Sequence, residues 1–468
     1  MNKVALLDSL ITEYRKTHPK SEQFFFESSG SLIGGGSHNL RLFRPFPFYD
    51  ADCRGSKIMD LDGNTYVDFW QGHFANILGH NPEVVSSVLC DRLGKNSGLT
   101  TGFPGTLQRN LAEVIIKRSY AERIRFTTSG TLATMYAIML SKSFTGQELV
   151  MKAGGGWHGA QPFVLKGITE YDNGLHKMES AGLSSEADVL VLTTRFNDIR
   201  HLEDQFSEHG ERLACLILEP FIGAGGFIFG HKEYLQAARD LTKKHGALLI
   251  FDEVVSGFRF HAGALQVLYG IEPDLTVFGK AIGGGMPVSA LGGREDVMAL
   301  CGPDAPRGKR VRFEGGTFSA HPLSMLAGLT FLNHLITNEE DIYPRIGRKG
   351  QSIRSEIENI FDSFGFNVRC TGGSDDIKFG SSVIGTHFLC QDVHEVVSPE
   401  QVWNPSVCDF QMREQIFKLA MLAEGYNIFH GYGALSASHS DEDIQGSLDA
   451  VERVAKKWKD LGLRACLK

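Results

Sequence analysis

Short, almost wholly apolar runs divide the middle of the chain into regular units. Between about Arg123 and Gly293 the runs are RIRF, ELVMK, DVLVL, LACLIL, GALLIF and DLTVF, and stretches with helical periodicity lie between them. Strands that are apolar on both faces are typical of a parallel sheet covered by helices on each side. The pattern therefore predicts an α/β domain with a mainly parallel central sheet between helices.

The two ends of the chain carry a different pattern. Residues 58–69 alternate apolar and polar positions around Asp62-Gly63, which predicts a β-hairpin. After Thr337 a long polar helix, the strand-like runs NVRCTG and VIGTHFLC, and a further helix from about Met412 predict a smaller α+β domain. Its irregular stretch 391–405 is predicted to be a surface loop. We expect an N-terminal segment (1–60) that contributes to the small domain, a large domain (61–335) and a C-terminal small domain (336–468).

Composition narrows the class of protein. The 468 residues carry a formal net charge of −8 and no cluster of five or more Lys and Arg, which argues against a nucleic-acid partner. No run approaches the roughly 18 apolar residues of a membrane span, and the N-terminus looks like an amphipathic helix rather than a signal peptide. Eight scattered cysteines without a Cys-x-x-Cys pair suit reduced thiols in the cytoplasm better than disulfides or a zinc site. We expect a cytoplasmic protein without a metal site.

Three strand ends carry chemical groups. Ser129, Gly130 and Thr131 lie where a strand turns into a helix, so their N–H groups predict either a phosphate site or a plain N-cap. Asp252 ends an apolar strand, where a carboxylate needs a partner; the alternative to a ligand is an ion pair with an arginine such as Arg259. Lys280 ends the next strand, where an amine is either a nucleophile with a lowered pKa or a lysine that reaches back to solvent.

These three groups together are more specific than each alone. A phosphate site, an acidic partner for a pyridinium nitrogen and an imine-forming lysine are the three handles of pyridoxal 5′-phosphate. The carboxyl ends of parallel strands meet at one edge of such a sheet, which brings the three handles together. A nucleotide-dependent oxidoreductase would share the sheet, but no G-x-G-x-x-G follows its first strand.

Nearly the whole chain resembles the class III aminotransferases of the fold-type I pyridoxal phosphate enzymes. The resemblance is carried by GGGSHNLRLF, ILGHN, TSGTLAT, GGWHG, FDEVVSGFR, DLTVFGKAIGGGMPVSALGG and GGTFSAHPLS. It is strongest in the branch of glutamate-1-semialdehyde 2,1-aminomutase and the β-amino-acid aminotransferases. The implied architecture is a large domain with a mainly parallel sheet plus a smaller α+β domain.

The resemblance also implies a role for individual residues. Lys280 would hold the cofactor as a Schiff base and shuttle a proton, and Asp252 would keep the ring nitrogen protonated. Phosphate would be bound at the 129–131 turn, and Thr317 would reach the cofactor of the other subunit in a homodimer with shared sites. The remaining implied cofactor contacts are Trp157, His158, Asn197, Glu219 and Val254.

Each of these contacts has a simpler alternative. His158 could be a satisfied structural histidine, while Asn197 and Glu219 could be ordinary hydrogen-bonding groups of the loops or core. Thr317 could be only a turn residue. On the substrate side, Arg41 matches an arginine that grips a carboxylate, although it could be a surface arginine, and His73 stands where the aminomutase has a tryptophan beside its substrate.

Departures from the family pattern concern the substrate. Leu132 replaces a glutamate of the usual SGTEAT, and Gly431 stands at the place of the aminomutase's active-site glutamate. Residues 170–186 lie where aminomutases carry a gating loop, or form a solvated loop. We therefore expect amino-group transfer on a small amino-acid or keto-acid substrate that bears a carboxylate, with the intramolecular glutamate-1-semialdehyde aminomutase reaction as the alternative.

Overall fold

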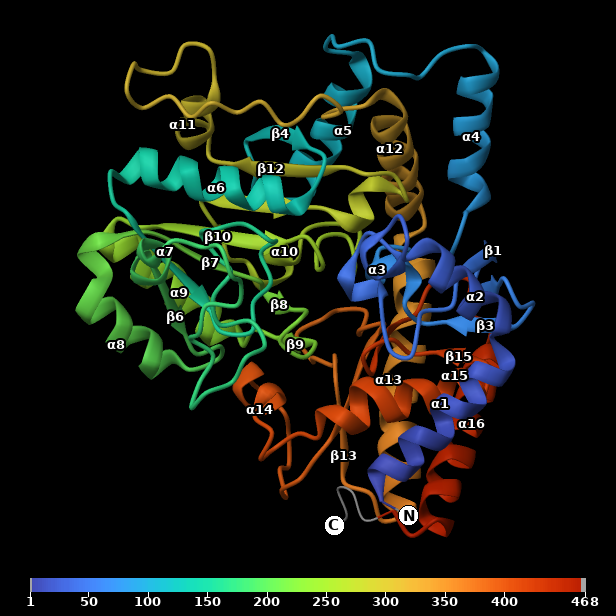
Figure 1. Cartoon of the computed structure of the whole chain (residues 1–468). Helices are drawn as coiled ribbons and strands as arrows, with labels where there is room; N and C mark the ends of the chain where they lie inside the picture. Colours follow the sequence, from blue (N-terminus) through green and yellow to red (C-terminus); the bar gives the residue numbers. More distant parts are fainter. Residues whose placement is uncertain (1, 464–468) are drawn as a thin grey trace.

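A central sheet of seven strands organises the computed structural model, which describes residues 2–463 (Figure 1). Only β12 runs antiparallel to its neighbours in this sheet, and the other pairings are parallel. The predicted fold class is thereby confirmed. In spatial order the strands are β4 (Arg123–Thr127), β12 (Ser289–Gly293), β11 (Leu275–Phe278), β10 (Leu248–Glu253), β7 (Leu213–Leu218), β5 (Leu149–Ala153) and β6 (Val191–Thr194).

Both faces of the sheet are buried because its strands are apolar at successive positions. Leu248 and Ile250 pack in the cluster that contains α6 (Gly130–Thr145), whereas Leu249 and Phe251 pack in the cluster of α8 (Ile199–His209) and α9 (Lys232–His245). Successive strand side chains point to opposite faces, so one run of residues supplies two cores. α12 (Pro322–Thr337) packs beside α4 (Glu83–Gly94) and α5 (Thr106–Lys117).

A second lobe joins the two ends of the chain. The predicted hairpin is confirmed: β2 (Lys57–Asp60) and β3 (Thr65–Asp68) pair antiparallel, and β3 also pairs with β15 (Tyr426–Asn427). The predicted boundary at residue 60 falls inside this hairpin. The other elements of the lobe are β1 (Asp50–Arg54), β13 (Val368–Thr371), β14 (Val383–Phe388), β16 (Tyr432–Ala434), α13 (Glu339–Ser363), a π-helical turn (Met412–Phe417), α15 (Lys418–Ala423) and α16 (Asp441–Asp460).

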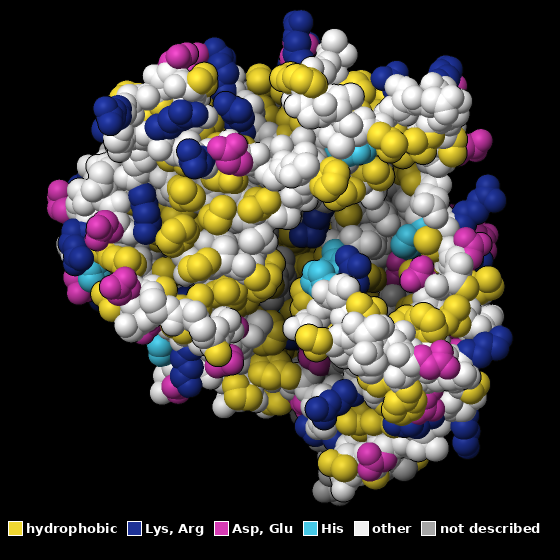
Figure 2. All heavy atoms as spheres, turned by 45° about the horizontal axis from the view of Figure 1, so that its top comes forward, with side chains coloured by type: hydrophobic (Ala, Val, Ile, Leu, Met, Phe, Trp, Pro, Cys, Tyr) yellow, Lys and Arg dark blue, Asp and Glu magenta, His cyan; other side chains and the backbone are white. Residues whose placement is uncertain are grey.

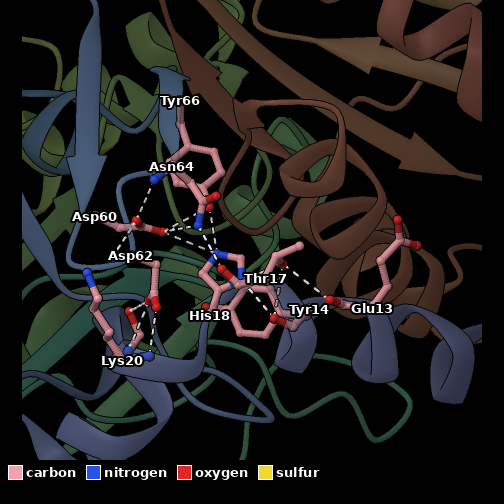
Figure 3. A network of polar contacts seen from close by, with 10 residues as sticks. Glu13, Tyr14, Thr17, His18, Lys20, Asp60, Asp62, Asn64 and Tyr66 are labelled. Carbon is pink, nitrogen blue, oxygen red and sulfur yellow. Dashed lines mark hydrogen bonds and ion pairs between the residues drawn. The ribbon is translucent and has the colours of Figure 1, made fainter.

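Buried polar contacts fix the first two helices to the hairpin (Figure 3). His18, between α1 (Lys3–Thr17) and α2 (Pro19–Ser28), places Nε2 2.6 Å from the Tyr66 hydroxyl, which itself donates to Asp60. Asp62, in the hairpin turn, accepts from the backbone N–H groups at the start of α2. The hairpin turn thus supplies the N-terminal cap of a helix some forty residues earlier in the sequence.

The predicted surface loop at 391–405 is wrong in part, because it contains α14 (Pro399–Trp403). Ser398 and Gln401 form a capping box at its start, and Val402 is fully buried. α14 packs against glycines of the large domain: a Cβ on Gly155 would lie 2.3 Å from Pro399. Within residues 2–463 no helix is long and apolar enough to cross a membrane.

Shorter elements complete the large domain and the connections. They are α3 (Gln71–Phe74), α7 (Ser185–Leu190), α10 (Leu265–Tyr269), α11 (Glu295–Met298), β8 (Phe221–Ile222), β9 (Ile228–Phe229) and the 3-10 turns at Ile33–Gly35, Asn39–Arg41, Gly210–Arg212, Lys280–Gly283 and Ala299–Cys301.

Candidate active site

The predicted groups gather at the carboxyl ends of the central strands. In the space-filling view a hollow opens between the two lobes, with histidine and basic side chains on its wall (Figure 2). Val254 links two of the predicted handles: a Cβ on Gly130 would lie 3.0 Å from one Val254 methyl, and a Cβ on Gly279 would lie 3.1 Å from the other. The start of α6 and the residue before Lys280 therefore meet on the same valine.

Among residues 2–463, the buried carboxylate of Asp252 has no lysine or arginine side chain within ion-pair distance. Its Oδ2 lies 2.9 Å from Nδ1 of His158, and its Oδ1 accepts from the Val254 N–H. Burial lowers the pKa of His158, although the bond to Asp252 opposes this shift, so the ring is a neutral donor to the carboxylate. Arg259 does not pair with Asp252, because its guanidinium donates to the carbonyls of Phe74 and Leu435 instead. The carboxylate of Asp252 therefore remains available to a ligand.

The first turn of α6 offers backbone donors. The Ser129 hydroxyl caps Leu132 N–H at 3.4 Å, and within the described part of the chain the N–H groups of Gly130 and Thr131 have no acceptor. Donors at a helix N-terminus bind anions such as phosphate. Ser129 is thus an N-cap, as the simpler alternative predicted, and the next two amides remain available to an acceptor.

Lys280 is separated from β11 by Gly279 alone and has a backbone φ of +45°. A side chain with a positive φ is strained, and such strain is concentrated at functional sites. Burial lowers the pKa of its amine, while the charges of Asp252 and Glu219 oppose that shift. The outcome is an amine that loses its proton more readily than a solvated lysine, as a nucleophile requires.

The glycine loop after β5 carries Trp157 and His158. The backbone N–H of Trp157 donates to Glu219 at 2.8 Å, and the other Glu219 oxygen accepts from Gly223. Burial, together with the nearby Asp252 charge, raises the pKa of Glu219 to about 8. Lys152 stabilises this loop, because its Nζ donates to the carbonyls of Gly156 and Lys166 at 2.8 and 2.6 Å.

The two predicted substrate residues are in contact. Nε of Arg41 donates to Nε2 of His73 at 3.0 Å, and the Lys280 charge reaches His73. Asn197 is engaged elsewhere: its amide bonds the carbonyls of Phe229 and Val397 and accepts from His231 N–H. Thr317 lies on an exposed turn beside Phe318, which is 58% exposed.

These donors fit pyridoxal phosphate. Three groups match parts of that cofactor: the free N–H groups at the start of α6 match its phosphate, the carboxylate of Asp252 matches its ring nitrogen, and the buried amine of Lys280 matches its aldehyde. Within residues 2–463 no group of three or more His, Cys, Asp or Glu side chains is placed to hold a metal ion.

Sequence reasoning missed three residues of this region. Lys152 ends an apolar strand as Lys280 does, so the same signal could have found it. His430 contacts the carbonyl of Leu40, the residue before Arg41, and pairs with Glu414, but both come from a part of the chain where no motif marks them.

Comparison with known proteins places this site in context. The family model described as Aminotransferase class-III matches residues 44–379. A glutamate-1-semialdehyde 2,1-aminomutase of Sulfurihydrogenibium azorense is 37% identical over 446 residues, which are 93% of this chain and 99% of that protein. The structure of a β-phenylalanine aminotransferase from Variovorax paradoxus superposes with a TM-score of 0.85 at 28% identity, covering 98% of this chain and 99% of the other. A transaminase solved with PLP bound gives a TM-score of 0.82 at 25% identity over 95% and 99% of the two chains.

Proposed function

Since the chain belongs to the class III aminotransferases and uses pyridoxal phosphate, we propose that Lys280 is the residue that bonds this cofactor during amino-group transfer on a carboxylate-bearing substrate. The observation that carries the proposal is that Gly279, the residue before Lys280, meets Asp252 and the start of α6 around Val254. When bound, pyridoxal phosphate supplies an aldehyde for the substrate amine and an electron sink for the adjacent carbon.

The protein supplies the charges and proton transfers. Asp252, kept in place by His158 and Val254 N–H, holds a proton at the ring nitrogen. The Gly130 and Thr131 amides bind the phosphate. The Lys280 Nζ takes and returns the proton that moves during transfer, because burial favours its neutral form. Trp157 and Val254 would cover the ring faces, and Glu219 holds the Trp157 backbone.

Arg41 would take the substrate carboxylate. Its Nε is occupied by His73, which leaves the two Nη groups for a bidentate contact. Ordinary intermolecular transamination is our first candidate, because His73 and Gly431 depart from the aminomutase pattern and the structure of the β-phenylalanine aminotransferase is similar over nearly its whole length. The second candidate is the intramolecular glutamate-1-semialdehyde reaction, which is supported by the 37% identity to the Sulfurihydrogenibium enzyme.

A single-turnover experiment separates the two candidates. The enzyme is first converted to the aminated form of its cofactor and then mixed with glutamate-1-semialdehyde or with a panel of keto acids. Transamination predicts that a keto acid is converted to a free amino acid and that the cofactor absorbance returns to that of the form before amination. The aminomutase reaction predicts that the semialdehyde is consumed, 5-aminolevulinate appears and the cofactor stays aminated.

We also propose a cytoplasmic homodimer with shared active sites. Support comes from exposed apolar side chains near Thr317: Phe318 is 58% exposed, and Leu99 and Phe103 are 69% and 83% exposed. Gly98 lies against Leu323 at the start of α12, so the segment with Leu99 is close to the Thr317 turn. Sedimentation equilibrium tests the dimer. Mixing inactive Lys280→Ala and Thr317→Asp proteins tests sharing, because subunit exchange would restore one intact site per dimer.

A further inference from the structure

The wall beside Lys280 is built from strained backbone. The 71–74 turn has a positive φ at each of its four residues, with values of 45°, 60°, 60° and 67°, and His430 has a φ of 57°. Only one of these residues is a glycine. Asp68 accepts from the N–H groups before and at the start of the turn, and Arg259 donates to the carbonyl at its end. Residues in such conformations persist only where the surroundings hold them.

His73, on this turn, acts as an acceptor. Its Nε2 accepts a hydrogen bond from Arg41 Nε, and the two nitrogens are 3.0 Å apart. Burial, followed by the Arg41 charge, lowers the pKa of His73 to about 3, so its ring stays neutral under ordinary conditions. A guanidinium is planar, so fixing Nε fixes the direction in which both Nη groups point.

His430 contacts the backbone next to the same arginine. His430 Nε2 lies 3.3 Å from the carbonyl oxygen of Leu40, the residue before Arg41, and Nδ1 is paired with the Glu414 carboxylate. Both partners can only accept, so each ring nitrogen donates when the two bonds form together. Arg413 fixes the other Glu414 oxygen with two contacts of 2.9 and 2.8 Å.

Arg413 is itself immobilised inside the small lobe. It is 1% exposed, and its guanidinium lies 5.0 Å from the ring centres of both Trp403 and Tyr432. Burial opposes ionisation of Glu414, but Arg413 and His430 outweigh it and hold the Glu414 pKa at about 2. The Leu40 carbonyl is therefore linked to the core of the small lobe through a continuous series of polar contacts.

We propose that His73 and His430 are positioning residues that clamp Arg41, one through its guanidinium and one through its backbone, so that its Nη groups face a substrate carboxylate beside Lys280. The inference rests on the proposed function, because it gives the Arg41 contact its purpose. It changes the expected role of His73, from a residue that touches the substrate to one that acts through Arg41. A tryptophan or phenylalanine at position 73 has no acceptor and would release the arginine.

The clamp predicts a selective loss of carboxylate binding. The probe is 3-phenylpropanoate, an unreactive carboxylate, compared with its neutral amide by calorimetry on the holoenzyme. We expect His73→Phe to weaken 3-phenylpropanoate about tenfold and to leave the amide within twofold. His73→Gln, which retains an acceptor, should recover most of the loss. His38→Phe is the matched control, because the His38 ring lies 4.9 Å from that of His73 but has no bond to Arg41.

A double-mutant cycle decides whether the histidines act through Arg41. In an Arg41→Ala background, His73→Phe and His430→Phe should each cost less than twofold more, because the group that they position is gone. Equal losses for carboxylate and amide, or full losses that persist without Arg41, would overturn the clamp. Two results would refute the proposed role of Arg41: unchanged carboxylate binding in Arg41→Ala, or equal binding of the carboxylate and the amide by wild type. Because the clamp depends on that role, either result would refute the clamp as well.

Discussion

Replacing Lys152 by methionine tests how the glycine loop that carries Trp157 and His158 is stabilised. Lys152 is fully buried, and burial lowers its pKa from 10.5 to about 7, although the charges of Glu179 and Glu219 oppose this shift. A neutral amine has two hydrogens, and its two acceptors are the carbonyls of Gly156 and Lys166. The neutral form of Lys152 therefore satisfies the loop without a buried charge.

The magnitude follows from proton linkage. Between the folded pKa of about 7 and the unfolded value of 10.5 the unfolded chain binds more protons, so this lysine makes folding more favourable as pH rises. From pH 6 to pH 9 the gain is about 2.5 kcal/mol in the free energy of unfolding. At pH 9 Lys152→Met also leaves two buried carbonyls without a donor, at about 1–3 kcal/mol each.

Urea unfolding of both proteins, followed by circular dichroism at pH 6, 7, 8 and 9, measures this difference. The gap between wild type and Lys152→Met should widen by about 2.5 kcal/mol across the series, while other groups titrate equally in both proteins. Lys177→Met, on the exposed 170–186 segment, is the matched control and should show no widening. Parallel curves for wild type and Lys152→Met would refute the view that a neutral amine holds the loop.

Other predictions concern the cofactor site and acid stability. Lys280→Ala should lower turnover by roughly a thousandfold or more while cofactor still survives gel filtration, and retained turnover would end the assignment of Lys280. Gly130→Ala places a methyl group 3.0 Å from Val254, so cofactor affinity in a fluorescence titration should fall about tenfold. An unchanged affinity would contradict the tight packing of Gly130 against Val254. Burial lowers the pKa of His439 to about 4, so its ring resists protonation in the folded protein. As pH falls from 6.5 to 4, the free energy of unfolding of wild type should therefore drop by roughly 3 kcal/mol relative to that of His439→Asn. A difference in urea midpoints that does not depend on pH would contradict this.

The cofactor side could be predicted because its geometry follows from local pattern. Continuous apolar runs identify parallel strands, and the carboxyl ends of such strands meet at one edge. Asp252 and Lys280 therefore had to be neighbours once their strands were recognised, and the Ser129 turn follows a third strand of the same sheet. The partner of Asp252 was less predictable, because His158 lies on an irregular loop whose path depends on Lys152 and Glu219.

The substrate side depends on contacts between distant parts of the sequence. Arg41 and His430 are brought together because β3 pairs with β15, a pairing that joins the two ends of the chain. No local pattern sets that register. α14 was missed for a different reason: the capping box of Ser398 and Gln401 was legible, but a helix of five residues gives too little periodicity to outweigh a polar segment.

This division has a consequence for specificity. The predicted cofactor handles lie in or just after strands of the central sheet, whereas His430, which contacts the backbone beside Arg41, follows β15 in the other lobe. Substitutions in that lobe can change which substrate group meets Lys280 without altering the environment of Asp252. Conversely, similarity to both an aminomutase and a β-phenylalanine aminotransferase does not decide between their reactions. Under the proposed clamp the residues that hold Arg41 would discriminate between substrates, so the clamp variants bear on the identity of the substrate more directly than any change at the cofactor.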